Sequence, residues 1–250
     1  MPQSPWILER PPNGPVSLRL FCFPHAGGGP SAFARWAPLA PAGVQISVVS
    51  LPGREARAHE APITRFRALV SALAWHLGPA LLPPFGFYGH SMGALLAHAL
   101  SRRLSRTGAP GPLWLGLGAC QAPPAPREDP PWSTLPDEEL LQALDQRYGG
   151  IPAAVRADPD LRRFLLPSMR ADMAALESWA PEDGGEVPAA VRLFSGEADA
   201  LAGAVDPVAW ASVLGRDPGF DVVPGDHFFH RERPGALAVL DALRADLGLG

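Results

Sequence analysis

The stretch that decides the fold runs from Phe85 to Leu104 and is written FGFYGHSMGALLAHALSRRL. Its apolar start, Phe85–Tyr88, predicts a buried strand, and the pattern over Gly93–Leu104 predicts a helix. Between them stands Gly89-His90-Ser91-Met92-Gly93, the Gly-x-Ser-x-Gly pattern of a sharp strand-to-helix turn that exposes a serine hydroxyl. Ser91 is therefore a candidate nucleophile above the edge of an α/β sheet.

Outward from this turn, short apolar runs alternate with longer periodic ones. Strands apolar on both faces are typical of parallel sheets covered by helices, so the alternation predicts one doubly wound α/β domain over residues 1–250. The further predicted strands are Ser17–Phe23, Val44–Leu51, Leu113–Leu117, Ala190–Phe194 and Phe220–Val223, and the further predicted helices of this pattern are Thr64–Leu77 and Pro234–Leu247.

Residues 121–185 interrupt the alternation. A Pro-rich link over Ala122–Pro126 precedes two helical patterns with no strand between them. The first covers Asp137–Tyr148 and ends at Gly149-Gly150. The second begins at Asp158-Pro159, a good N-cap followed by a first-turn proline, continues to about Trp179, and is predicted to kink at Pro167. A helical insertion between two strands is a candidate lid.

An activated serine needs a base, and the base needs a carboxylate that orients it. In the order expected after a nucleophile turn, Asp199 follows one predicted strand and His227 follows the next. Both are thus expected at the edge of the sheet where ligands bind. Other carboxylates lie nearby in the sequence, namely Glu197, Asp206 and Asp226.

The oxyanion of such a reaction needs backbone amides, one of which should be that of Met92, directly after the nucleophile. The second is expected from the loop after an early strand, Phe23–Gly29, where successive glycines allow close approach of the backbone. His25 in this loop is either a substrate contact or a structural residue. The run Gly27–Ala32 also fits a dinucleotide fingerprint, but the second strand ends Val48–Pro52 without the acid that would hold a ribose.

Composition excludes several other classes of function. The net charge of −4 excludes a basic nucleic-acid footprint, and a sequence without any Lys excludes Schiff-base chemistry and a P-loop. The two cysteines, Cys22 and Cys120, are expected to be buried free thiols.

Residues 68–101 carry no Asp, Glu, Lys or Arg, but glycines, prolines and histidines interrupt them, so we expect no membrane span. No secretory signal is evident, which favours a cytoplasmic location.

Two further sets of residues receive plain interpretations. His227-x-x-His230 has no third ligand in the sequence, so no metal is expected. Arg54 and Arg57 are expected on a solvated or salt-bridged surface, where an acidic partner could use them.

With these residues placed, the sequence resembles type II thioesterases, the stand-alone editing enzymes of polyketide and nonribosomal peptide synthases. The resemblance covers nearly the whole chain and rests on these segments: Leu20–Gly28, Leu51–Glu55, Gly89–Ala94, Leu135–Leu140, Tyr148–Pro152, Leu166-Pro167, Arg170–Asp172 and His227–Phe229. It departs from the family at Ala200, where Pro is frequent, at Asp226, where Gly is usual, and at Gly118–Pro123, which lacks a frequent Arg.

The resemblance implies an α/β-hydrolase fold with a helical lid over 121–185. It also implies hydrolysis of acyl groups from the phosphopantetheine thiol of acyl or peptidyl carrier proteins, with no cofactor beyond the one on the substrate. In the same way it assigns Ser91, Asp199 and His227 to a catalytic triad and the amides of Ala26 and Met92 to the oxyanion hole. A monomer is expected.

Two alternatives remain open at this point. A small-molecule carboxylesterase or lipase would share the fold and the triad. A catalytically silent module that binds an acyl ligand or a synthase would share the fold alone.

Overall fold

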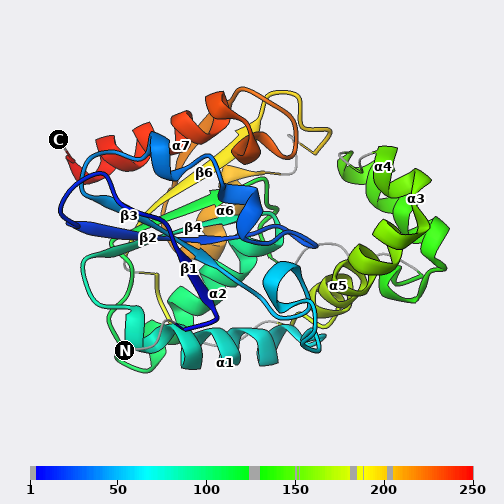
Figure 1. Ribbon diagram of the computed structural model, residues 1–250. Helices are drawn as coiled ribbons and strands as arrows, with labels where there is room; N and C mark the ends of the chain where they lie inside the picture. Colours follow the sequence, from blue (N-terminus) through cyan, green and yellow to red (C-terminus); the bar gives the residue numbers. More distant parts are fainter. Residues whose placement is uncertain are drawn as a thin grey trace.

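A seven-stranded sheet forms the centre of the protein in the computed structural model (Figure 1). The structure describes residues 4–123, 130–149, 151, 153–180, 185–187, 189–201 and 205–249. The strand order is β1-β3-β2-β4-β5-β6-β7, and every neighbouring pair is parallel except β1 with β3. The strands are β1 (Ile7–Glu9), β2 (Leu18–Phe23), β3 (Val44–Val49), β4 (Phe85–His90), β5 (Trp114–Gly118), β6 (Ala190–Gly196) and β7 (Gly219–Val223). The predicted parallel α/β sheet is thus confirmed.

Helices cover both faces of the sheet, which is why its central strands are apolar at nearly every position. One face packs against α1 (Phe66–Leu77), α2 (Met92–Arg106) and Trp210 of α6 (Pro207–Leu214). The other face packs against α7 (Arg233–Leu247) and two short 3₁₀ helices, η1 (Pro30–Phe33) and η2 (Ala37–Leu39). Figure 1 shows α7 and α1 on opposite sides of the sheet.

The antiparallel edge strand β1 was not predicted. It lies in a Pro-rich stretch that offers only three strand residues, and its pairing with β3 depends on tertiary contacts. Trp6, just before the strand, is buried and stacks on the ring of His76, with a distance of 4.6 Å between ring centroids. This anchor holds the short strand on the sheet.

The helical insertion consists, in its described part, of α3 (Asp137–Tyr148), α4 (Ala153–Ala157) and α5 (Pro159–Glu177), which lie together to one side of the sheet (Figure 1). It has a small apolar cluster of its own, made of Leu140, Leu141, Leu144, Val155, Leu166 and Met173. Ala26 and Leu176 pack against both this cluster and a core cluster of the sheet. The insertion thus shares apolar contacts with the core of the sheet at Ala26 and Leu176, and further hydrogen bonds join the two.

Both predicted helices of the insertion are present, and the short helix α4 was missed. The side chain of Asp158 caps α5 as expected, because its Oδ1 accepts hydrogen bonds from the backbone N–H groups of Asp160 and Leu161 at 2.8 and 3.3 Å. The helix continues through Pro167, and the kink there stays a prediction. Gly150 and most of the link over 122–126 lie outside the described residues.

Two expectations from composition have a counterpart in the structure. Cys22 and Cys120 are buried and unpaired, as expected. Among the described residues, no helix has the length and apolarity needed to cross a membrane.

Candidate active site

Ser91 stands at the turn between β4 and α2, in a strained backbone conformation with φ 53° and ψ −118°. The two glycines of the pattern are required by space. A Cβ on Gly89 would lie 2.2 Å from the carbonyl oxygen of Gly93, and a Cβ on Gly93 would lie 2.1 Å from that of Phe23. The turn is therefore the tight strand-to-helix elbow that the sequence predicts. Met92 begins α2, so its N–H group has no acceptor within the helix.

Asp199 and His227 come together at the carboxyl ends of β6 and β7. Two hydrogen bonds join the loops that carry them, each 2.9 Å long. The N–H of Ala198 donates to the carbonyl of Gly225, and the N–H of Glu197 donates to the carbonyl of Val223. The Nδ1 atom of His227 lies 2.9 Å from Oδ2 of Asp199, and both side chains are buried. The other carboxylate oxygen of Asp199 accepts the N–H of Leu201. The carboxylate is thereby fixed on both sides.

The rival carboxylates have other positions. Asp206 caps α6, since its Oδ1 accepts the N–H of Val208 at 2.8 Å. Asp226 accepts the N–H of Phe228 at 2.7 Å and stays exposed, and Glu197 is exposed as well. Among these acids the structure places only Asp199 against the His227 ring.

The loop after β2, here called the glycine loop (Phe23–Gly29), turns sharply beside Ser91. The N–H of Gly28 donates to the carbonyl of His25 at 2.9 Å, and Gly27 has φ 74°. A positive φ at the third residue of such a turn is typical of type II, which requires glycine there. Because the His25 carbonyl is engaged inside the turn and the peptide is trans, the N–H of Ala26 points out of the turn.

A buried ion pair holds this loop from outside. Asp172 of α5 accepts the N–H of Gly27 at 2.7 Å and binds Arg54 through both carboxylate oxygens, at 2.6 and 2.8 Å. Arg54 also donates to the carbonyl of Gly28 at 3.2 Å. The expectation that Arg54 and Arg57 lie on the surface was wrong. Both are buried, and Arg57 donates to the carbonyl of Ser50 and pairs with Glu60.

Behind His227 lie two buried histidines, His90 and His230, with the half-buried His25 beside them, and the sequence did not predict this group. The Nε2–H of His90 donates to the carbonyl of His227 at 2.6 Å, which leaves Nδ1 of His90 to accept from the hydroxyl of Tyr88 at 3.0 Å. His230 stacks on His90, and its Nε2 lies 3.3 Å from Nδ1 of His25. Gly118 leaves room for this network, because a Cβ there would lie 2.4 Å from the Tyr88 hydroxyl.

Burial keeps this group of histidines uncharged. It lowers the pKa of His90 and that of His230 well below the usual 6.5, with neighbouring histidines adding to the shift. Burial, together with the charge of Arg231, lowers the pKa of His25 to about 3. The His227 backbone therefore rests on neutral rings across the physiological range.

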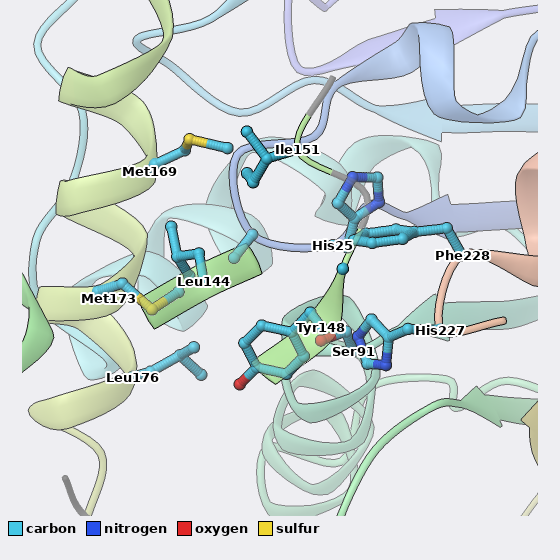
Figure 2. A pocket seen from close by; sticks show the side chains of 12 residues that line it. His25, Ser91, Leu144, Tyr148, Ile151, Met169, Met173, Leu176, His227 and Phe228 are labelled. Carbon is cyan, nitrogen blue, oxygen red and sulfur yellow. The ribbon is translucent and has the colours of Figure 1, made fainter. Parts of the chain in front are cut away.

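An apolar chamber opens in front of Ser91 and His227 (Figure 2). Figure 2 shows Met169, Met173 and Leu176 extending from α5 toward the space beside the serine, with Leu144 and Tyr148 between. Counted together with the open space at its mouth, this recess has a volume of about 480 Å³. The lining residues are His25, Ala26, Ser91, Leu144, Tyr148, Gly149, Ile151, Met169, Met173, Leu176, His227 and Phe228. This lining includes no acid and no arginine, which suits an uncharged acyl chain.

A second groove adjoins the chamber. It shares the walls His25, Ala26, Ile151, Met169 and Phe228, and continues between the glycine loop and α5. Its lining is more polar than that of the chamber and includes Ser31, Glu55 and Arg231. Arg231 is exposed and has no acidic partner among the described residues. The two recesses thus meet at the wall that His25 and Ala26 form. Ser91 lines the apolar chamber, and the second groove is partly charged.

Sequence reasoning found Ser91, Met92, His227 and the glycine loop but missed other residues of the site. Asp172 and Tyr148 come from the insertion, and neither pattern nor spacing relates them to Ser91. The centroid of the Tyr148 ring lies 4.8 Å from that of His227. His25 lines both recesses, and its Nδ1 atom lies 3.3 Å from Nε2 of His230, so it has the structural contact, and the contact with substrate stays a prediction. No group of three or more metal-ligating side chains occurs among the described residues.

Comparisons with known proteins add a family to this geometry. The model of the thioesterase domain matches residues 18–247. A protein of gramicidin S biosynthesis from Aneurinibacillus migulanus, GrsT, is 34% identical over 224 residues, which cover 90% of this chain and 87% of that protein. The type II thioesterase resemblance drawn from the sequence is thereby confirmed.

Solved structures of thioesterases are also similar to this chain. RedJ, a thioesterase from the prodiginine biosynthetic pathway in Streptomyces coelicolor, has a TM-score of 0.81 with 32% identity and covers 92% of this chain and 91% of its own. BorB, a type II thioesterase from the borrelidin biosynthetic cluster, has a TM-score of 0.80 with 30% identity and covers 97% of this chain and 98% of its own. These similarities confirm the α/β-hydrolase fold.

Proposed function

Because the chain belongs to the thioesterase family and is a thioester hydrolase, we propose that it clears acyl groups from the phosphopantetheine thiol of carrier proteins. The acyl and peptidyl carriers concerned would be those of a polyketide or nonribosomal peptide synthase. The relatives named for such pathways motivate this choice of substrate. The observation that supports it most is the apolar chamber lined by Ser91 and His227, which shares the wall of His25 and Ala26 with a second, partly charged groove.

In the proposed mechanism Ser91 is the nucleophile and His227 is its general base. His227 removes the hydroxyl proton as Ser91 attacks the thioester carbonyl, and Asp199 holds the imidazole in the tautomer with Nε2 free to accept. The tetrahedral oxyanion is bound by the N–H groups of Ala26 and Met92. Collapse expels the pantetheine thiol, and a water activated by the same histidine then hydrolyses the acyl-enzyme.

The leaving group makes the first half of this reaction easier than the second. A thiol has a pKa of about 8.5, so its thiolate departs more readily than an alkoxide and needs less help from His227 as an acid. The acyl-enzyme is an oxyester, and its breakdown is expected to limit the rate. Slow turnover suits an editing enzyme, which must spare correct intermediates.

In this proposal the apolar chamber takes the acyl chain and the second groove takes the pantetheine arm. The chamber contains two methionines, Met169 and Met173, whose flexible side chains adapt to acyl groups of different shape. Arg231, which has no acidic partner in the described part of the chain, lines this groove, and its guanidinium could bind a phosphate. The helical insertion over 121–185 would act as the lid of both recesses.

A carrier protein adds a surface to the pantetheine arm, and binding energy from that surface can raise kcat/KM. Arg54 is no part of such a surface, because it is buried. Arg162 and Arg163 of α5 form ion pairs with Glu138 and Asp160, so Arg231 is the better candidate for contact with an acidic carrier. The proposal needs no resident cofactor. It fits a monomer acting in the cytoplasm beside its synthase.

The test is kcat/KM for one acyl group presented on a carrier protein, on coenzyme A and as a simple oxyester. We expect the order carrier, coenzyme A, ester. Equal values for carrier and coenzyme A would remove the carrier surface from the proposal. A faster ester would favour a carboxylesterase, and no hydrolysis of any substrate would favour a silent binding module.

A further inference from the structure

The buried ion pair between Arg54 and Asp172 joins three segments of the chain at the glycine loop. Arg54 follows β3, Asp172 lies on α5 of the insertion, and the loop follows β2. The exposed fractions of the two side chains are 5% and 1%. Burying two charges is costly, and a hydrophobic pair of similar volume is often as stable or more so. The pair is therefore weak evidence for stability, and its contacts point to another role.

Those contacts are with the peptide groups next to Ala26. Asp172 accepts the N–H of Gly27, and Arg54 donates to the carbonyl of Gly28. Type I and type II turns differ by a flip of the central peptide, here the peptide between Ala26 and Gly27. In the flipped turn the Gly27 N–H would leave Asp172 and the Ala26 carbonyl would turn toward the carboxylate. The carboxylate therefore selects the orientation observed.

Neighbouring side chains fill the space around the same turn. A Cβ on Gly27 would lie 2.7 Å from Cγ of Met169, and one on Gly29 would lie 2.5 Å from Oε1 of Glu55. Glu55 accepts the N–H and the hydroxyl of Ser31 at 3.1 and 2.6 Å. The loop is thus packed closely on the outside, and the ion pair supplies the charge-assisted hydrogen bond that fixes the central peptide.

We propose that Arg54 and Asp172 are positioning residues, which anchor the peptide groups after Ala26 and so hold the glycine loop where the Ala26 N–H can meet the oxyanion. The Ala26 N–H belongs to the peptide before the central one, so the pair acts on it through the position of the loop. Asp172 lines neither recess, whereas Arg54 also lines the second groove, so Asp172→Asn, which leaves Arg54 in place, separates positioning of the loop from contact with the pantetheine arm. Arg54 neutralises and orients the carboxylate, and Asp172 orients the peptide. The inference rests on the proposed hydrolysis at Ser91. Since the oxyanion hole serves every acyl substrate, loss of the pair should slow all substrates by the same factor.

The experiment compares three variants of the full chain with the wild type. Asp172→Asn keeps the shape but loses the charge, and the double variant Arg54→Met with Asp172→Leu replaces the whole pair by apolar groups. Asp137→Asn is the matched control, since it removes an exposed ion pair with Arg170 in the same insertion. Thermal unfolding, kcat and KM are measured with two acyl thioesters of different chain length and one oxyester.

We expect the double variant to unfold near the wild-type temperature, because an apolar pair of similar volume can replace a buried ion pair. Its kcat should fall on the order of 10²-fold for every substrate with KM nearly unchanged, as when one oxyanion donor is lost. Asp172→Asn should show the same uniform loss, together with an upfield shift of the Gly27 amide proton. The Asp137→Asn control should stay within about twofold of the wild type.

A folded double variant with wild-type kcat would overturn the inference, and so would a loss confined to one chain length, which would indicate a role in shaping the chamber. If the double variant does not fold, Asp172→Asn decides by the same criteria. Failure of the proposed function would be seen separately, as a wild-type chain whose Ser91 is not labelled by a fluorophosphonate.

Discussion

The edge of the sheet and the helical insertion contribute to one site in different ways. Ser91, Asp199 and His227 follow β4, β6 and β7 directly, so the backbone of the sheet fixes where they lie. The loops that carry the acid and the histidine are tied by backbone hydrogen bonds, and His90 supports the carbonyl of His227. These groups are held by elements that belong to the main core.

The insertion holds its position through side chains. Its own cluster has six buried apolar residues, and its surface carries ion pairs such as Arg170 with Asp137. It supplies most of the apolar chamber wall, including Leu144, Met169 and Met173. The difference indicates that the sheet edge determines the chemistry and the insertion determines which acyl chain fits. Changes at the edge, or in the Asp172 contact with the glycine loop, should therefore lower all rates, and changes in the chamber wall that the insertion supplies should alter selectivity.

The largest effect is expected at the nucleophile. Ser91→Ala removes the group that forms the acyl-enzyme and should lower kcat on the order of 10⁶-fold, as in other triad hydrolases. Steady-state hydrolysis of an acyl thioester measures it, with circular dichroism to confirm the fold. Turnover near the wild-type rate would refute the assignment.

A smaller but still large effect is expected at the acid. Asp199→Asn should lower kcat on the order of 10⁴-fold, because an amide favours the wrong tautomer of His227. Asp226→Asn is the matched control, since Asp226 lies next to the histidine in sequence but its exposed side chain accepts the N–H of Phe228 and does not bind the His227 ring. If Asp226→Asn shows the large loss of kcat and Asp199→Asn does not, the assignment of Asp199 as the orienting acid is wrong.

In the insertion, Met173→Ala should change selectivity more than rate. The buried Met173 side chain lines the chamber, so its truncation should favour bulkier acyl groups at a cost of about 2–5 kcal/mol in unfolding free energy. Leu161→Ala is the control on the same helix, because Leu161 is exposed and lies outside the chamber. If Met173→Ala hydrolyses acyl groups of different chain length with the same relative rates as the wild type, this wall of the chamber does not determine selectivity.

The smallest effect concerns acid stability. Burial lowers the pKa of His98 to about 4 and that of His25 to about 3, and lowers those of His90 and His230 well below 6.5. Between these values and about 6.5, the unfolded chain binds protons that the folded chain does not. Stability should be full above pH 6.5 and fall on acidification, by up to about 1.4 kcal/mol per pH unit for each histidine.

His98 offers a way to isolate one such contribution. It lies on α2 away from the chamber, and its Nε2 has no hydrogen-bond partner among the residues that the structure describes. In denaturant titrations between pH 7.5 and 5.5, His98→Leu should lose less stability on acidification than the wild type. An equal loss in both proteins would show that His98 is not part of the acid response.

The sequence predicted what depends on local pattern. The elbow at Ser91 needs only a strand, two glycines and a helix, and the positions of Asp199 and His227 follow from the strands before them. The cap of α5 by Asp158 is equally local. By contrast, Asp172 meets Arg54 across 118 positions of the chain, and no periodicity relates them. The same holds for Trp6 on His76, the contact that seats the unpredicted strand β1.

Two patterns quoted for their resemblance, Leu51–Glu55 and Arg170–Asp172, did contain the residues of this ion pair. Nothing in these two patterns indicates that Arg54 and Asp172 meet in the fold. Arg54 was therefore expected on the surface. Only the fold shows that the buried charge of Arg54 is matched by Asp172 and that both face the glycine loop.

Stoichiometric labelling tests the central claim, thioester hydrolysis by Ser91, most directly. The full chain is titrated with a fluorophosphonate, the modified residue is located by peptide mass spectrometry, and hydrolysis of a carrier-bound acyl group is measured on the same samples. We predict one phosphonyl group per chain on Ser91, with hydrolysis falling linearly to zero as that site fills. Full hydrolysis by a chain labelled at Ser91, or inactivation with the label on another residue, would contradict the account.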